Sequence, residues 1–172
     1  MLDPFEGAQP NAPLLHEDQY TDGTDPKTSK PSNIFRTISG ERGDVEEGFA
    51  EADEIVEREF RSQPVHQGYI EPMACVVNTS EDGNVELWTS TQGHFVARTL
   101  LSNLLNIEMA KIRVTASEIG GGFGGKTTIY AEPVAVRLSQ MTSRPVRMAM
   151  TRSEVFRATG PTVGSVCRIK MG

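Results

Sequence analysis

Residues 111–127, KIRVTASEIGGGFGGKT, contain the pattern from which the fold is most directly argued. Apolar and polar residues alternate over 111–117, and this period of two predicts a strand. Five glycines then fall within 120–125. Glycine loses much conformational entropy on folding, so a simple turn would not need so many. We therefore expect a backbone that passes close to a ligand and offers its amide N–H groups to an anion or oxo group, with Phe123 directed into the site.

The same glycine-rich loop satisfies two nucleotide-binding patterns, and neither has its full context. GxxxxGK[ST] would use Lys126 and Thr127 as in a phosphate-binding loop. The preceding strand contains charges, however, and the helix would have to include Pro133, at a cost of about 3 kcal/mol for an interior proline. We expect that helix to begin near Pro133 instead. GxGxxG would need an acidic residue about 20 positions on, where the sequence has RPVR at 144–147.

The remaining periodicities indicate a mixed α and β chain. A turn, EDGN at 81–84, separates two alternating runs and predicts a β-hairpin. Leucines spaced for a helix follow, and Asp44 with Glu47 has the spacing of a helix N-terminal cap. We predict an α+β fold with a mixed sheet, a β-hairpin and two or three packed helices. The predicted helices cover residues 45–54, 94–106 and 133–141, and the predicted strands cover 56–60, 73–79, 85–91, 111–117 and 145–150.

The first 34 residues differ in composition from the rest. Half of the ten prolines fall here, among Asp, Gly, Ser and Thr: Pro4, Pro10, Pro13, Pro26 and Pro31. Such a segment buries too little apolar area to offset the entropy of ordering it. We predict an extended linker or strap over residues 1–34 and a globular domain over 35–172.

Composition limits the classes of function. The 172 residues carry a formal net charge of -6, which argues against a nucleic-acid surface. No apolar run approaches the ~18 residues of a membrane span, and no secretory leader is visible. Cys75 and Cys167 form neither a disulfide framework nor an iron–sulfur motif. We expect a soluble, cytoplasmic protein that binds neither nucleic acid nor membrane.

Several phrases of the sequence, in register, resemble the large subunit of the molybdenum hydroxylases, the family of xanthine dehydrogenase, aldehyde oxidase and carbon monoxide dehydrogenase. The resemblance covers roughly residues 34–161, and Gln92 precedes Phe123 by the interval typical of the family. It rests on TSTQ at 89–92, GGGFGGK at 120–126, YIEP at 69–72, SRPV at 143–146, TRSE at 151–154 and GP at 160–161.

The resemblance implies a molybdenum–molybdopterin site in which this segment supplies no direct metal ligand. Gln92 would donate its side-chain amide to an oxo group on molybdenum, and the backbone of Phe123 and Gly124 would approach the metal centre. Gly122 and Gly125 complete the implied cofactor-binding set. A neutral donor and backbone amides would stabilise an electron-rich oxygen without displacing the pterin sulfurs. The pterin is expected in a dinucleotide form.

Thr127 is the informative departure from the family pattern. Purine-oxidising members carry a glutamate after the GGK lysine, and a threonine cannot do acid–base work there. We therefore expect Thr127 to line the substrate pocket of an enzyme that hydroxylates an aldehyde or an N-heterocycle with water-derived oxygen. The glycine-rich loop reads GGK where carbon monoxide dehydrogenases tend to differ, and no active-site cysteine loop appears in this sequence. Both observations disfavour the carbon monoxide dehydrogenase branch.

The family's catalytic glutamate lies in a part of the large subunit that this sequence does not match. The resemblance thus implies a first section of the molybdopterin-binding domain, inactive alone and containing no catalytic residue. Its expected partners are the rest of its own large subunit, domains or subunits carrying iron–sulfur clusters and FAD, and a small-molecule substrate.

One alternative stays open: a non-enzymatic α+β module that binds an anion, a nucleotide or a protein partner through the glycine-rich loop. Among the remaining residues, Glu71 is either a pocket acid or structural, and Lys126 either holds a carbonyl or phosphate or is solvated. His16, His66 and His94 have no metal-ligand spacing.

Overall fold

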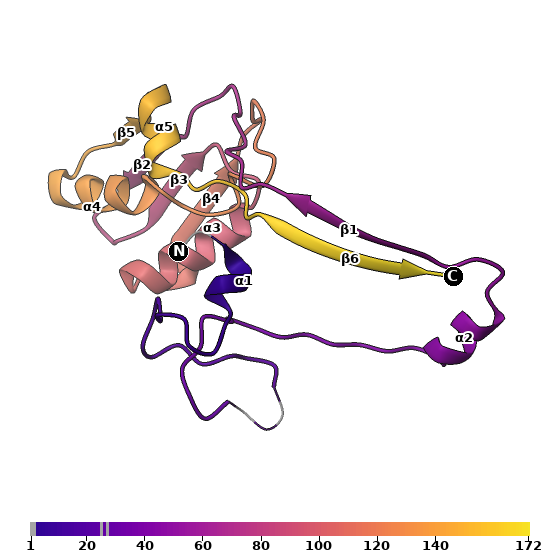
Figure 1. The fold of residues 1–172 in the computed structure, drawn as a ribbon. Coiled ribbons are helices and arrows are strands. Elements are labelled where there is room, and N and C mark those ends of the chain that lie inside the picture. The colour runs from indigo at the N-terminus through magenta and orange to yellow at the C-terminus, as the bar shows by residue number, and fades with distance from the viewer. Residues whose placement is uncertain (1–2, 25, 27) are drawn as a thin grey trace. The chain divides into compact units, whose positions relative to one another are not determined.

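The computed structural model describes residues 3–24, 26 and 28–172, and it divides into two compact units. The first contains Met1–Val56 and Lys170–Gly172, and the second contains Glu57–Ile169 (Figure 1). The division into a linker over 1–34 and a domain over 35–172 stays a prediction. Met1, Leu2, Asp25 and Lys27, which fall within that linker, lie outside the described residues.

The second unit is built on a four-stranded mixed sheet. Its order is β4-β3-β2-β5, from strands β2 (Ala74–Thr79), β3 (Val85–Thr89), β4 (Ile112–Ala116) and β5 (Val146–Ala149). The hairpin partner β3 and the strand β5 both pair antiparallel with β2, whereas β3 and β4 are parallel. A parallel pair needs a crossover connection, and helix α3 (His94–Leu105) supplies it.

One face of the sheet packs against α3 and α4 (Glu132–Thr142), as the period of two along each strand requires. This core contains Cys75, Val77, Val85, Leu87 and Ile112 from the strands and Leu101, Ala135 and Val136 from the helices. The prediction of an α+β fold with a mixed sheet, a hairpin and packed helices is confirmed. The helix after the glycine-rich loop begins at Glu132, so Pro133 sits in its first turn, where a missing N–H costs nothing.

The prediction lacked the elements at the C-terminal end. Helix α5 (Arg152–Ala158) follows a capping box in which Thr151 accepts from the backbone of Glu154 and the Glu154 side chain accepts in return. Strand β6 (Ser165–Met171) pairs with β1 (Val56–Ser62) in a separate two-stranded sheet. A second core cluster, Tyr69, Met73 and Val155, lies between α5 and the segment that leads into β2.

Among its described residues, the first unit contains two short helices. Helix α1 (Pro4–Gly7) is capped by Asp3, and α2 (Val45–Glu51) by Asp44, the residue expected from the sequence. The Asn33 side chain connects the end of α1 with residues 13–15: Nδ2 donates to the carbonyls of Gly7 and Pro13, and Oδ1 accepts from the N–H of Leu15. Residues assigned to a linker therefore contain local hydrogen-bonded structure.

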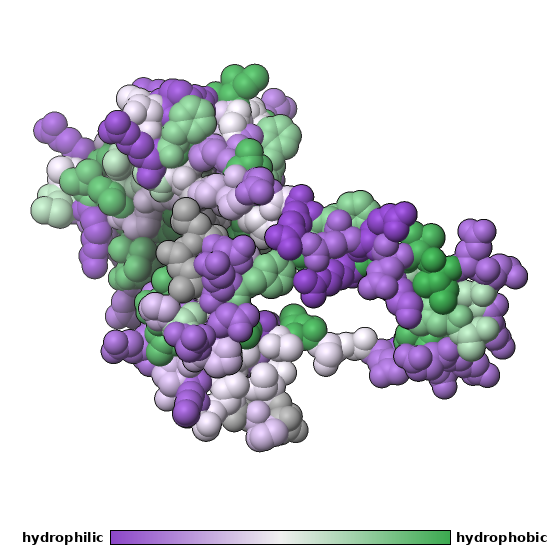
Figure 2. Space-filling view, viewed as in Figure 1, coloured by the Kyte–Doolittle hydropathy of each residue, from purple (hydrophilic) through white to green (hydrophobic). Residues whose placement is uncertain are grey.

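Among the described residues, no helix has the length and apolar character that crossing a membrane requires. Apolar residues are interspersed with hydrophilic ones over the visible surface (Figure 2). Several large apolar side chains are exposed, including Ile70, Phe95, Phe123 and Met141.

Candidate functional site

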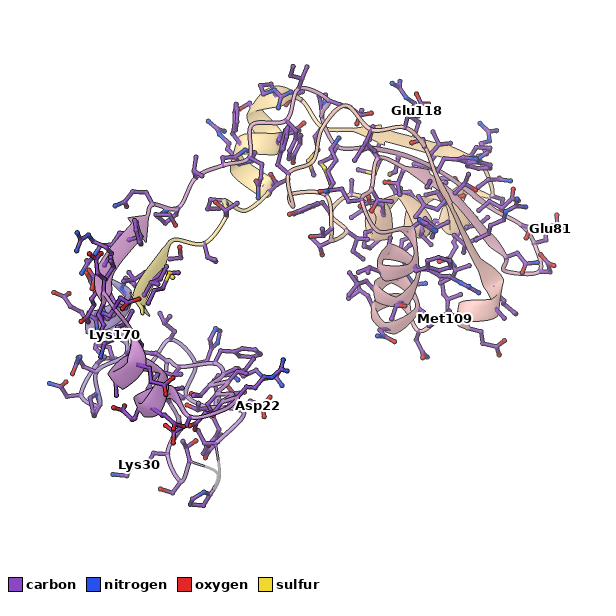
Figure 3. The ribbon with its side chains drawn as sticks, turned by 90° about the vertical axis from the view of Figure 1, so that its right-hand side faces the viewer. Asp22, Lys30, Glu81, Met109, Glu118 and Lys170 are labelled. Atoms are coloured by element: carbon purple, nitrogen blue, oxygen red, sulfur yellow. The ribbon has the colours of Figure 1, made fainter. Side chains whose placement is uncertain are left out.

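The topology of the second unit brings the two predicted parts of the site together. Because β3 and β4 are parallel neighbours, their carboxyl ends lie at the same edge of the sheet. Residues 90–92 follow β3, and the glycine-rich loop follows β4 after a short segment that includes Glu118. Figure 3 labels Glu118 in this segment, and Glu81 at the turn of the hairpin. Ligands bind preferentially at carboxyl edges of this kind in sheets with parallel strands.

Gln92 is held by the loop through both its backbone and its side chain. Its Oε1 accepts from the N–H of Gly124 at 3.0 Å and from the N–H of Lys126 at 3.2 Å. Its own N–H donates to the carbonyl of Lys126 at 2.8 Å, and the Thr91 hydroxyl donates to the same carbonyl at 3.1 Å. These hydrogen bonds hold the segment after β3 in a fixed position relative to the end of the loop.

These bonds also fix which way the Gln92 amide faces. Two backbone donors require the carbonyl oxygen on the loop side, so Nε2 occupies the opposite position. Within the described part of the chain, Nε2 makes no hydrogen bond, and the residue is exposed. Gln92 thus presents a neutral, oriented donor.

The close approach of Gln92 explains a glycine at position 122. A Cβ there would lie 2.4 Å from Oε1 and 2.6 Å from Cδ of Gln92. At position 120 a Cβ would lie 2.7 Å from the Cβ of Glu71. Both contacts are too short for any side chain, so the loop packs directly on its neighbours through bare backbone.

The middle of the loop adopts left-handed backbone at a residue that is not glycine. Phe123 has φ 50°, between Gly121 at 91° and Gly124 at 87°. A non-glycine residue in this region costs of order 1–3 kcal/mol, and such strain concentrates at functional sites. The Phe123 side chain is 72% exposed. In the described structure, the N–H groups of Gly121, Gly122 and Phe123 have no protein acceptor.

Lys126 forms a buried ion pair. Its side chain is fully buried, and Nζ donates to Oε2 of Glu71 at 2.6 Å while lying 4.9 Å from the ring centroid of Tyr69. The expectation of a solvated lysine is wrong. A lysine consumed in this ion pair is also not free to reach a phosphate, which removes the central element of the phosphate-loop alternative.

Glu71 supplies the negative charge that compensates the buried ammonium group of Lys126. Burial raises the pKa of Glu71, but hydrogen bonds from Lys126 and from the N–H of Gly120 outweigh it and hold the pKa below its ordinary value. The carboxylate therefore stays charged at neutral pH. Its bonds to Lys126 and Gly120 make it a structural partner of the loop, while its side chain stays 35% exposed and also lines a pocket with Thr89 and Arg147.

Thr127 lies at the end of the loop with its hydroxyl already engaged. Oγ1 donates to the carbonyl of Gly124 at 3.0 Å, and the residue is exposed. Its remaining lone pairs can accept a hydrogen bond from an incoming molecule. Its predicted place in a substrate pocket stays a prediction.

Sequence reasoning missed a buried acid next to this site. Glu132 is 3% exposed, and it accepts from the hydroxyl of Thr89 and the N–H of Tyr130, each at 2.7 Å. It thereby joins the end of β3 to the start of α4. An acidic residue in the first turn before proline could have indicated this role, because carboxylates favour helix N-termini.

The histidines do not gather at this site. His66 packs beside Tyr69, and its Nε2 lies 2.8 Å from the hydroxyl of Thr159. His94 begins α3. In the part of the chain that the structure describes, no three His, Cys, Asp or Glu side chains form a group that could hold a metal ion.

The surface around Gln92 contains several hydrogen-bond donors that have no protein acceptor among the described residues. They are the Nε2 of Gln92 and the N–H groups of Gly121 and Phe123, while the carboxylate of Glu71 is engaged with Lys126. Such donors suit an oxygen-rich or electron-rich group, because backbone and side-chain amides can stabilise it without a charged side chain.

The sequence is similar to a known family of domains. Residues 27–172 match the model of the molybdopterin cofactor-binding domain family. The chain is 32% identical over 158 residues to a probable xanthine dehydrogenase subunit of Bacillus subtilis, covering 92% of this chain and 20% of that protein. It is also 32% identical over 163 residues to the carbon monoxide dehydrogenase large chain of Afipia carboxidovorans, again covering 92% and 20%.

The fold is also found in a solved enzyme structure. The aldehyde oxidoreductase from Desulfovibrio desulfuricans superposes with a TM-score of 0.76 at 17% identity, covering 98% of this chain and 18% of that one. At this identity the likeness concerns the fold alone. The chain spans about a fifth of the length of these relatives.

Proposed function

The chain belongs to the molybdopterin cofactor-binding domain family, and on that basis we propose that it is part of the large subunit of a molybdenum hydroxylase. The complete polypeptide would hydroxylate an aldehyde or an N-heterocycle with oxygen derived from water. Because the relatives are about five times longer than the matched region, this activity is proposed for the polypeptide that contains these residues. The segment alone is proposed to be inactive.

The observation that carries the proposal is the orientation of Gln92. Its carbonyl oxygen is saturated by two loop amides, so its Nε2 is directed away from the loop with no partner among the described residues. This donor and the N–H groups of Gly122 and Phe123, which have no acceptor in the described structure, would hold the electron-rich side of a molybdenum–pterin group. When bound, that group supplies the redox chemistry.

The residues of the chain would bind and orient without competing for the metal. An amide N–H is neutral and donates only, so Gln92 and the loop backbone stabilise negative charge but do not displace other ligands. Preorganised donors of this kind need no rearrangement during a reaction. The glycines allow the backbone to approach closely, as the packing of Gly122 against Gln92 illustrates.

The substrate class is proposed from Thr127. Its hydroxyl is tied to the Gly124 carbonyl, so this position offers a neutral acceptor at the loop surface. A purine would be better served by an acidic side chain there. Relatives named for xanthine and for carbon monoxide are equally identical to this chain, so the choice of an aldehyde or N-heterocycle rests on Thr127. We further propose a dinucleotide form of the pterin, and iron–sulfur and flavin partners for electron removal.

Two substitutions at Gln92 test the role of its donor separately from its packing. Gln92→Glu keeps an acceptor for the amides of Gly124 and Lys126 but replaces the Nε2 donor with oxygen. Gln92→Ala removes both. In the native polypeptide, we expect Gln92→Glu to preserve the melting temperature and lower turnover about 100-fold, the scale seen when one preorganised donor is lost. Gln92→Ala should lower both.

The matched control is Gln140→Glu on α4, where the side chain accepts from Arg137 and can still do so after the change. It should leave turnover and stability unchanged. Wild-type turnover of Gln92→Glu, with molybdenum present, would show that Nε2 has no part in the reaction. A native polypeptide without molybdenum would instead favour the anion-binding module.

A further inference from the structure

The two ends of the glycine-rich loop meet at one side chain. Oε2 of Glu71 accepts from the N–H of Gly120 at 2.9 Å and from Nζ of Lys126 at 2.6 Å. The backbone N–H of Glu71 in turn donates to the carbonyl of Gly120 at 3.1 Å. The first and last residues of the segment 120–126 are therefore fastened to the same carboxylate.

Lys126 passes this attachment on to Gln92. While its side chain is held by Glu71, its N–H donates to Oε1 of Gln92 at 3.2 Å, and its carbonyl accepts from the N–H of Gln92 at 2.8 Å. A continuous series of hydrogen bonds thus runs from Glu71 through Lys126 to Gln92. A displacement of Lys126 would therefore also displace the side-chain amide of Gln92, whose Nε2 faces outward.

The side chains of Glu71 and Lys126 differ in their exposure to solvent. The Lys126 side chain is 0% exposed, whereas that of Glu71 is 35% exposed. A glutamate that loses its partner can remain hydrated, but a lysine that loses its partner is left as a buried, uncompensated charge. Removing one member of a buried pair is much more damaging than replacing both with neutral residues.

We propose that Glu71 and Lys126 are positioning residues that clamp the glycine-rich loop and thereby set the Gln92 donor toward its ligand. This inference rests on the proposed function for the identity of the ligand, but the clamp itself is a property of the loop. It assigns the pair a role through Gln92, with no contact of its own to the cofactor.

The unequal exposure predicts that a second substitution rescues the first. Glu71→Gln leaves Lys126 buried without a counter-charge, so the loop should open. Lys126→Met fills the same space with an apolar chain. In the double variant, the new glutamine side chain can still accept from the N–H of Gly120 and no charge is buried, so the loop should close again.

Hydrogen–deuterium exchange measured by mass spectrometry on the native polypeptide tests this directly. Glu71→Gln should speed exchange of amides in 120–127 by about tenfold or more, with peptides of β2 and β3 unchanged. The double variant should return to within about threefold of the wild type. Glu86→Gln, which breaks an exposed pair with Arg113 at 4.0 Å, is the matched control and should change nothing.

Molybdenum content per polypeptide provides the second measurement, with a loss expected in Glu71→Gln and recovery in the double variant. A double variant as open as Glu71→Gln, or faster exchange spread over the whole sheet, would overturn the clamp. If the wild type carries no molybdenum, the proposed function fails, whereas the exchange pattern still decides whether the clamp exists.

Discussion

Gly122→Ala is the substitution for which the structure predicts the clearest local effect. The new Cβ would lie 2.4 Å from Oε1, 2.6 Å from Cδ and 2.9 Å from Cγ of Gln92. These contacts are too short to persist, and the side chain of Gln92 is the part that can move, because it is exposed. Its displacement breaks the hydrogen bonds from the N–H groups of Gly124 and Lys126.

The size of the effect follows from the two lost bonds. Each contributes about 1 kcal/mol net, so the loop loses about 2 kcal/mol of local stability. At about 1.4 kcal/mol per factor of ten, this corresponds to about 30-fold faster exchange of the loop amides. Global unfolding should change less, since Gly122 lies outside the core cluster of the sheet.

Exchange of the peptide spanning residues 120–127 is the appropriate assay. Gly160→Ala is the matched control, since a Cβ there meets nothing within 4 Å. The double variant Gly122→Ala/Gln92→Ala should exchange no faster than Gln92→Ala alone, because alanine at 92 lacks every atom that clashes. Unchanged exchange in Gly122→Ala, or fully additive effects in the double variant, would refute the packing of Gln92 on the loop.

Two further predictions concern titration and reactivity. Burial raises the pKa of Glu71 but the hydrogen bonds from Lys126 and Gly120 lower it further, so the folded-state pKa lies below the unfolded one. The stabilisation is therefore present above the ordinary pKa of glutamate and is lost as pH falls through the lowered pKa. In thermal melts from pH 7 downward, the melting temperature should fall less steeply with pH in Glu71→Gln than in the wild type. An equally steep fall in that variant would contradict the assignment. Burial, with the nearby charge of Glu132, raises the pKa of Cys75 to about 12. Peptide mapping after maleimide treatment at pH 8 should therefore find this thiol unmodified in the native protein and modified in denaturant. Rapid labelling of the native protein would show that the core around Cys75 is open.

The elements of the second unit that could be predicted from the sequence are those with a clear local pattern of residues. The alternation of apolar residues and the EDGN turn predicted β2 and β3, and the leucine spacing predicted α3. The order of the strands could not be read from these patterns, because pairing depends on contacts far apart in the sequence. The parallel pairing of β3 with β4, which places Gln92 beside the loop, appears only in the structure.

The ion pair of Glu71 with Lys126 was missed for the same reason. The two residues are 55 positions apart, and nothing in a GGK motif shows that its lysine is buried. The density of glycines predicted a backbone that passes close to a ligand. The protein neighbours of Gly120 and Gly122, which are Glu71 and Gln92, could be identified only from coordinates.

Whether this chain forms part of a molybdenum–pterin site can be decided by measuring the metal and pterin content of the native polypeptide that contains it. We predict molybdenum and pterin in stoichiometric amounts on a chain longer than these 172 residues. A pure, folded native polypeptide with neither would contradict it, and the donor surface around Gln92 would then have to serve another ligand.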